Sequence, residues 1–116
     1  MNTSSKTILI ARVSTREQSE GYSLDSQRKL LEDYGEHRNL HIVRKFIVPE
    51  SASGKQERKQ FNEMLEFLKE NPDIKTVLCE KVDRISRNFK DAQKIDDWIN
   101  ADEERQIHFV KQSLII

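Results

Sequence analysis

The sequence TILIARVSTREQ, residues 7–18, joins a short apolar run to a polar segment in which a serine lies between two arginines. A continuous apolar run such as TILIA (7–11) is typical of a strand buried on both faces of a sheet. The polar segment therefore leaves the end of a buried strand. Because sites in open α/β sheets form beyond the carboxyl ends of the strands, this stretch indicates both the fold class and the position of a site.

Strand-like and helix-like patterns alternate along the rest of the chain. Apolar residues at helical spacing predict three helices, which cover Leu24 to near Gly35 with Ser23 as N-cap, 61–68 with an end at Asn71-Pro72, and 89–99. Runs rich in apolar and β-branched residues predict four strands, at 7–11, 40–48, 75–82 and 107–110. The segment PESASGKQE (49–57) is expected to be a loop.

The order β-α-β-α-β-α-β implies right-handed crossovers and a mainly parallel sheet with helices on both faces. We therefore expect a three-layer α/β/α domain that spans residues 1–116, with the first strand central, between the second and third. Three polar segments, RVSTREQ (12–18), PESASGKQER (49–58) and KVDRISRN (81–88), would then meet at one edge of the sheet.

The composition excludes several classes of protein. No apolar run approaches the ~18 residues that a membrane span needs, and residues 1–6 lack the apolar core of a signal peptide, so a cytoplasmic protein is expected. Cys79 is the only cysteine, and its apolar surroundings predict an inert buried thiol. The three histidines have no partners at metal-ligand spacing, so no metal is expected. The sequence contains neither GxxxxGK(S/T) nor GxGxxG, so no nucleotide cofactor is expected either.

The distribution of charge is more informative than its total. The formal net charge is zero, which argues against binding of nucleic acid by bulk electrostatics alone. Residues 81–90 hold four basic residues and one acidic residue, whereas residues 91–105 hold two basic and six acidic residues. This segregation leaves room for a local anion site within a neutral domain.

Arginines gather in the three polar segments: Arg12, Arg16, Arg58, Arg84 and Arg87. Guanidinium groups bind phosphate oxygens in a bidentate manner and remain charged, so a cluster of them suits a phosphate and its more highly charged transition state. Ser14 is then a candidate nucleophile. The alternative is that these arginines are solvated and that Ser14-Thr15 only forms a turn or a helix cap.

Four ordered motifs, ARVSTREQ (11–18), GYSLDSQ (21–27), SASGKQERKQFNEML (51–65) and KVDRISRN, together resemble the catalytic domain of the serine site-specific recombinases, the resolvase and invertase family. The resemblance runs from residue 8 to about residue 110. The spacing of GYSLDSQ is closer to that of the large serine recombinases than to that of the small resolvases. Two departures are Ile10, where the family often has tyrosine, and Glu50, where it commonly has aspartate.

The resemblance implies a role for each matching residue. Ser14 would attack a DNA phosphodiester and form a 5′-phosphoserine link, and Asp83 would orient a group or transfer a proton. The scissile phosphate would be bound by Arg12, Arg58, Arg84 and Arg87. Gln18, Gln27 and Glu50 would be supporting positions.

The family also implies partners. These are DNA and a second copy of the protein, with dimers that pair into a synaptic tetramer. The pattern predicts that the chain stops at Ile116, just after the fourth strand. The resemblance then implies that a remaining sheet element, a dimer-forming helix and a DNA-binding domain belong to a longer protein.

Overall fold

The computed structural model describes residues 5–13, 24–49, 55–80 and 89–116. They form a five-stranded sheet in the order β2-β1-β3-β4-β5. Its strands are β1 (Ser5–Val13), β2 (Leu40–Pro49), β3 (Ile74–Cys79), β4 (Gln106–Phe109) and β5 (Leu114–Ile115). The helices are α2 (Leu24–His37), α3 (Lys55–Glu70) and α5 (Phe89–Asn100), together with the short 3₁₀ helix η1 (Val110–Gln112).

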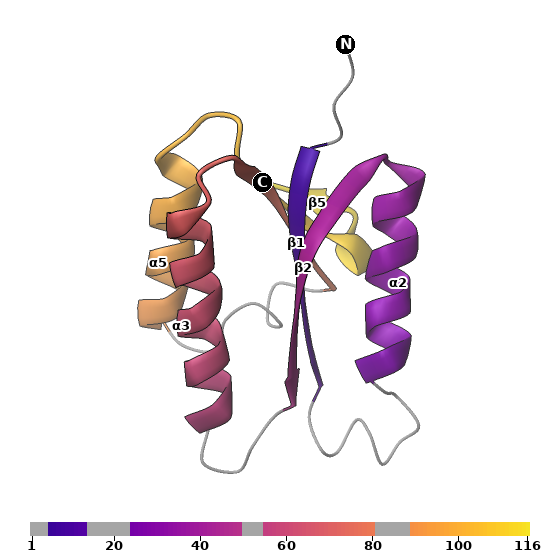
Figure 1. Cartoon of the computed structure of the whole chain (residues 1–116), viewed down its shortest axis with the longest axis horizontal. Helices are drawn as coiled ribbons and strands as arrows, with labels where there is room; N and C mark the ends of the chain where they lie inside the picture. The colour runs from indigo at the N-terminus through magenta and orange to yellow at the C-terminus, as the bar shows by residue number, and fades with distance from the viewer. Residues whose placement is uncertain (1–4, 14–23, 50–54, 81–88) are drawn as a thin grey trace.

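The sheet is the middle of three layers. Figure 1 shows α2 on one face of the sheet and α3 and α5 on the other. Strands β1 to β4 pair in parallel, and β5 pairs antiparallel with β4. The predicted three-layer fold with a mainly parallel sheet and a central first strand is confirmed.

Strand β1 supplies both cores because successive side chains of a strand point to opposite faces. Ile8 and Ile10 belong to the larger core, beneath α3 and α5, together with Phe61 and Trp98. Leu9 and Ala11 belong to the smaller core, beneath α2. The four β1 side chains are 0–2% exposed. This two-sided burial explains why the run TILIA lacks polar alternation.

Some predicted boundaries are wrong. Helix α3 begins at Lys55, inside the expected 49–57 loop, because its first turn, KQER, is made of good helix formers with no apolar residue to mark the periodicity. Strand β3 ends at Cys79 rather than Val82, since Glu80 is already a bend. Strand β4 ends at Phe109, and Val110 begins η1 instead of continuing the strand.

The expectation that the chain ends after its fourth strand is also wrong. After η1, Ser113 adopts a left-handed conformation with a φ of 50°, and the chain reverses into β5. Reciprocal backbone hydrogen bonds of 3.0 Å join Ile107 and Ile116. A strand as short as β5 carries too little periodicity to be recognised in a sequence.

Gly35 lies within the last turn of α2, as expected, but Asn39 is the residue with positive φ, at 57°. A Cβ atom on Gly35 would lie 3.1 Å from Cδ1 of Ile42. The glycine therefore permits close packing of α2 on the sheet, whereas Asn39, a residue that tolerates the left-handed region, ends the turn after the helix.

One polar cluster joins α2 to β4. The hydroxyl of Tyr34 lies 2.6 Å from Nδ1 of His108, and Nε2 of His108 lies 3.1 Å from Oε1 of Gln106. Because an amide oxygen only accepts, a neutral imidazole here donates from Nε2 and accepts from Tyr34 at Nδ1. Burial, and then the charge of Arg38, lowers the pKa of His108 below its ordinary value of 6.5.

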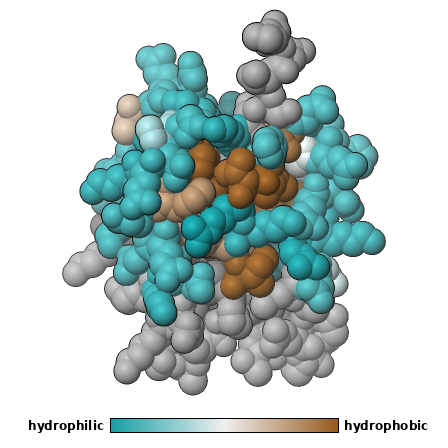
Figure 2. Space-filling view, in the orientation of Figure 1, coloured by the Kyte–Doolittle hydropathy of each residue, from teal (hydrophilic) through white to brown (hydrophobic). Residues whose placement is uncertain are grey.

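The surface is mostly hydrophilic. Figure 2 shows apolar atoms gathered in the middle of the face where β2 forms the edge of the sheet, with the hydrophilic surfaces of the helices around them. Val43 of β2 is 39% exposed. Among the described residues, none of the helices has the length and apolar character required to cross a membrane.

Candidate active site

The carboxyl edge of the sheet carries the candidate site. Strands β1, β2 and β3 are parallel and end at Val13, Pro49 and Cys79. In Figure 1 the ends of β1 and β2 and the first turns of α2 and α3 lie at the same, lower edge of the domain. The N-termini of these helices carry a partial positive charge at that edge, which favours an anion there.

Arg12 is the predicted site residue that the structure describes most fully. It lies one residue before the end of β1 and is only 6% exposed. Arg12 shares the strand parity of Ile8 and Ile10, whose side chains form the core beneath α3 and α5. Strand alternation therefore places the Arg12 side chain on the α3 face of the sheet.

Gln27 holds the main chain of Arg12 from the opposite face. Its Oε1 accepts a hydrogen bond of 2.8 Å from the backbone N–H of Arg12, and its Nε2 donates one of 3.0 Å to the carbonyl oxygen of Arg12. Gln27 lies in the first turns of α2 and is fully buried. Its amide thus bonds both backbone groups of Arg12, so it fixes the position and direction of the main chain at the end of β1.

Arg58 lies in the first turn of α3, on the face of the sheet that Arg12 shares. The structure thus brings Arg12 and Gln27 into contact and places the backbone of Arg58 at the same edge. The other predicted positions lie outside the described residues; they are Ser14, Gln18, Glu50, Asp83, Arg84 and Arg87. Arg16 and Ser23 also lie outside them.

Glu80 is a charged residue at this edge that the sequence interpretation did not single out. It follows β3 directly, and its side chain is completely buried. Its Oε2 lies 3.6 Å from Nζ of Lys111, and its carbonyl oxygen accepts a hydrogen bond of 3.0 Å from the backbone N–H of Lys111. The sequence signal was an acidic residue at the end of an apolar strand, where a structural role requires a buried partner.

No group of three or more histidine, cysteine, aspartate or glutamate residues that could hold a metal ion occurs within 5–13, 24–49, 55–80 and 89–116. Cys79 forms no disulfide bond and has no exposed surface, and the predicted burial of its thiol is confirmed. The chemistry available at the described part of this edge is therefore that of a buried guanidinium group, fixed backbone groups and helix N-termini, all of which suit an oxyanion.

Residues 7–115 match the family described as "Resolvase, N terminal domain". Comparison with curated protein sequences finds no match. The chain is similar to the solved N-terminal catalytic domain of TP901-1 integrase, with a TM-score of 0.73 and 25% identity over 95% of this chain and 80% of that one. It is also similar to a resolvase family site-specific recombinase from Streptococcus pneumoniae, with a TM-score of 0.70 and 28% identity over 95% and 74% of the two chains.

A third solved relative is the C-terminal catalytic domain of IS1535 TnpA, an IS607-like serine recombinase, with a TM-score of 0.57 and 26% identity over 87% of this chain and 67% of that one. Among the described residues, the family match covers the five strands, apart from the first two residues of β1, and the helices α2, α3 and α5. The chain belongs to the resolvase N-terminal domain family and is the catalytic domain of a serine recombinase, an enzyme that recombines DNA.

Proposed function

We propose that Ser14 is the nucleophile of this recombinase. Its Oγ would form a bond to the phosphorus of a DNA phosphodiester while the bond from phosphorus to the 3′-oxygen breaks. The serine proton is transferred away, the 3′-oxygen gains a proton, and the products are a 5′-phosphoserine link and a free 3′-hydroxyl. Attack by the 3′-hydroxyl of another strand reverses these steps and releases Ser14, so religation needs no ATP.

The observation that supports this proposal best is the fixed, buried Arg12 two residues before Ser14 in the sequence. A buried guanidinium group, carried by a main chain that Gln27 holds at the end of the central strand, is suited to stabilise charge on a phosphate. Arg58, Arg84 and Arg87 are proposed to bind the same phosphate, and Asp83 to orient a group or transfer a proton. Gln18 and Glu50 are proposed to support the site, and Gln27 acts through the main chain of Arg12.

The proposed partners are DNA and further copies of the recombinase. Because the net charge of the chain is zero, it has little sequence-independent attraction for DNA. We therefore propose that residues 1–116 act as one catalytic domain, and that most of the affinity for the recombination site comes from other parts of the recombinase. Dimers that pair into a tetramer would bring four such serines to the four strands that are exchanged.

The substitution Ser14→Ala tests the nucleophile. In the recombinase that carries this domain, recombination of a plasmid with two copies of the native site should be abolished by Ser14→Ala, while binding to the site should persist. Ser26→Ala, which alters an exposed serine of α2, is the matched control and should retain activity. Strand exchange by the Ser14→Ala protein would overturn the assignment.

A further inference from the structure

A pocket of about 450 Å³ lies between α3 and α5. Its apolar walls include Leu65 and Leu68 of α3 and the indole of Trp98, which lies in the last turn of α5. Helix α3 begins at the carboxyl edge of the sheet, so with a rise of about 1.5 Å per residue the pocket lies roughly 20 Å from the candidate active site. It is a separate feature at the opposite end of the domain.

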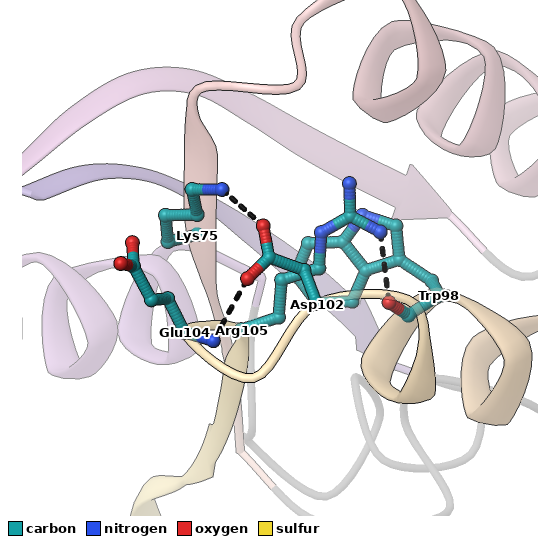
Figure 3. A network of polar contacts seen from close by, with 5 residues as sticks. All are labelled: Lys75, Trp98, Asp102, Glu104 and Arg105. Carbon is teal, nitrogen blue, oxygen red and sulfur yellow. Dashed lines mark hydrogen bonds and ion pairs between the residues drawn. The ribbon is translucent and has the colours of Figure 1, made fainter.

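The loop after α5 fixes Arg105 over this pocket. Figure 3 shows Asp102 between Lys75 of β3 and the backbone of the loop. Oδ1 of Asp102 accepts a hydrogen bond of 2.9 Å from the N–H of Glu104. The hydrogen bond from Lys75 lowers the pKa of the Asp102 carboxyl below its ordinary value of 3.8, so the carboxylate stays ionised in its ion pair with Lys75.

The guanidinium of Arg105 covers Trp98. Its carbon Cζ lies 5.0 Å from the centre of the indole, and its Nη1 donates a hydrogen bond of 2.8 Å to the carbonyl oxygen of Trp98 (Figure 3). This hydrogen bond satisfies a carbonyl at the negative end of α5. The carbonyl oxygen and the indole of Trp98 therefore orient the guanidinium group at the pocket.

Two buried donors at this pocket have no acceptor within the part of the chain that the structure describes. They are the indole Nε1 of Trp98 and Nε of Arg105. The Trp98 side chain is only 9% exposed, so bulk water does not readily satisfy its N–H group. Buried donors without acceptors cost free energy, so the surroundings of Arg105 and Trp98 are rich in donors and favour an acceptor group beside them.

The charges around the pocket favour a negatively charged ligand. Lys69 and Lys94 line it together with Arg105, and the acidic lining residue is Asp97. Oδ1 of Asp97 already accepts a hydrogen bond of 3.0 Å from Nε2 of Gln93. Three cations therefore face one carboxylate that is partly engaged by its own helix.

We propose that this pocket binds a glutamate or aspartate side chain, next to a leucine-like apolar residue, from a partner protein. The carboxylate accepts from the guanidinium of Arg105 and is attracted by Lys69 and Lys94, while the apolar neighbour covers Leu65 and Leu68. A peptide fits these mixed walls better than a nucleic-acid phosphate does, because a phosphate brings no apolar group. Because the pocket lies far from the carboxyl edge of the sheet, a partner bound there would leave the candidate active site free.

Trp98 provides a direct readout because it is the only tryptophan in the 116 residues. The probe is the blocked dipeptide acetyl-Leu-Glu-amide, titrated into the whole chain while tryptophan fluorescence is recorded. Acetyl-Leu-Gln-amide and inorganic phosphate are the two comparison ligands. We expect a saturable change with the glutamate peptide, at least about tenfold weaker binding of the glutamine peptide, and no saturation by phosphate at the same concentrations.

Two single variants complete the test. Lys69→Gln and Lys94→Gln should each weaken binding of acetyl-Leu-Glu-amide, whereas Lys29→Gln, on an exposed part of α2, should leave it unchanged. Circular dichroism of each variant checks that the fold persists. Equal binding of the two peptides, saturation by phosphate, or the absence of any saturable change in a folded protein would each overturn the proposal.

Discussion

The side-chain amide of Gln27 forms two hydrogen bonds with the backbone of Arg12, at 2.8 Å to its N–H and 3.0 Å to its carbonyl oxygen. Helix α2 thereby holds the main chain of β1 from one face, while the Arg12 side chain lies on the other face. The contact joins the GYSLDSQ motif to the ARVSTREQ motif, two segments whose link is not visible in the sequence. It gives Gln27 a role that acts through Arg12.

The first prediction is that Gln27→Ala destabilises the domain. Loss of the amide removes two hydrogen bonds to buried backbone groups of Arg12, which should lower the free energy of unfolding by about 2–4 kcal/mol. Urea denaturation followed by circular dichroism measures this change. Lys29→Ala, an exposed residue of the same helix, should alter the free energy of unfolding by less than about 0.5 kcal/mol. Similar values for the two variants would contradict the role of Gln27.

A second prediction concerns Arg12. Arg12→Lys keeps the positive charge but loses the planar fork and its bidentate hydrogen bonds. We expect the rate of strand cleavage by the recombinase to fall at least tenfold, while the free energy of unfolding changes by less than about 1 kcal/mol. Single-turnover cleavage of the native site measures the rate. An unchanged rate would show that Arg12 contributes only charge, or nothing, to the reaction.

The ion pair between Glu80 and Lys111 gives a third prediction. Lys111→Met removes the cation from a buried carboxylate and should destabilise the domain by about 1–2 kcal/mol, less than for a fully buried pair because Lys111 is 44% exposed. Glu80→Gln in the same chain should recover part of that loss, because a neutral amide needs no counter-charge. A double-mutant cycle from urea denaturation measures the coupling, and strictly additive effects would show that the pair is not coupled.

Glu80 also immediately precedes the segment 81–88, which carries three of the predicted site residues. Because the ion pair with Lys111 fixes Glu80, from which that segment leaves the sheet, Glu80→Gln should slow strand cleavage in the recombinase more than Asp96→Asn does. Asp96 is an exposed residue of α5 outside the pocket between α3 and α5, and it serves as the control. Equal cleavage rates for these two variants would limit Glu80 to a role in stability.

A fourth prediction is the pH dependence of stability that arises from His108. Burial lowers its pKa in the folded state, so between its folded pKa and its ordinary value of 6.5 the unfolded chain binds more protons than the folded chain. The stabilising contribution of the neutral imidazole is therefore complete above 6.5 and is lost as the pH falls through the folded pKa. Urea denaturation between about pH 7 and pH 5 should show this loss, and His108→Gln should show a smaller slope. An equal slope in His108→Gln would assign the pH dependence to other groups.

Much of the fold was predictable because the two-sided burial of β1 leaves a strong local pattern. The run TILIA and the amphipathic spacing of Phe61, Met64 and Leu68 follow directly from the packing of α3 against the sheet. The start of α3 at Lys55 and the strand β5 were not predictable in the same way. The first turn of α3 carries no apolar residue, and β5 is too short to show a period.

The candidate site was predictable from motifs only at the level of residue types. Arg12 and Gln27 were both expected to be site residues, but the contact between the Gln27 amide and the Arg12 backbone depends on how α2 packs against β1. Burial of Glu80 depends likewise on η1, which brings Lys111 beside the end of β3. Such partners are distant in sequence and are set by tertiary packing.

The most direct test of the central claim is covalent trapping of the recombinase on a nicked suicide substrate that carries its native recombination site. The nick lets a short fragment diffuse away after cleavage, so the protein–DNA link cannot be religated. Nuclease digestion, proteolysis and mass spectrometry then locate the nucleotide adduct. We predict a 5′-phosphate adduct on Ser14. Cleavage with the adduct on another residue, or specific binding of the site with no adduct at all, would contradict the proposed mechanism.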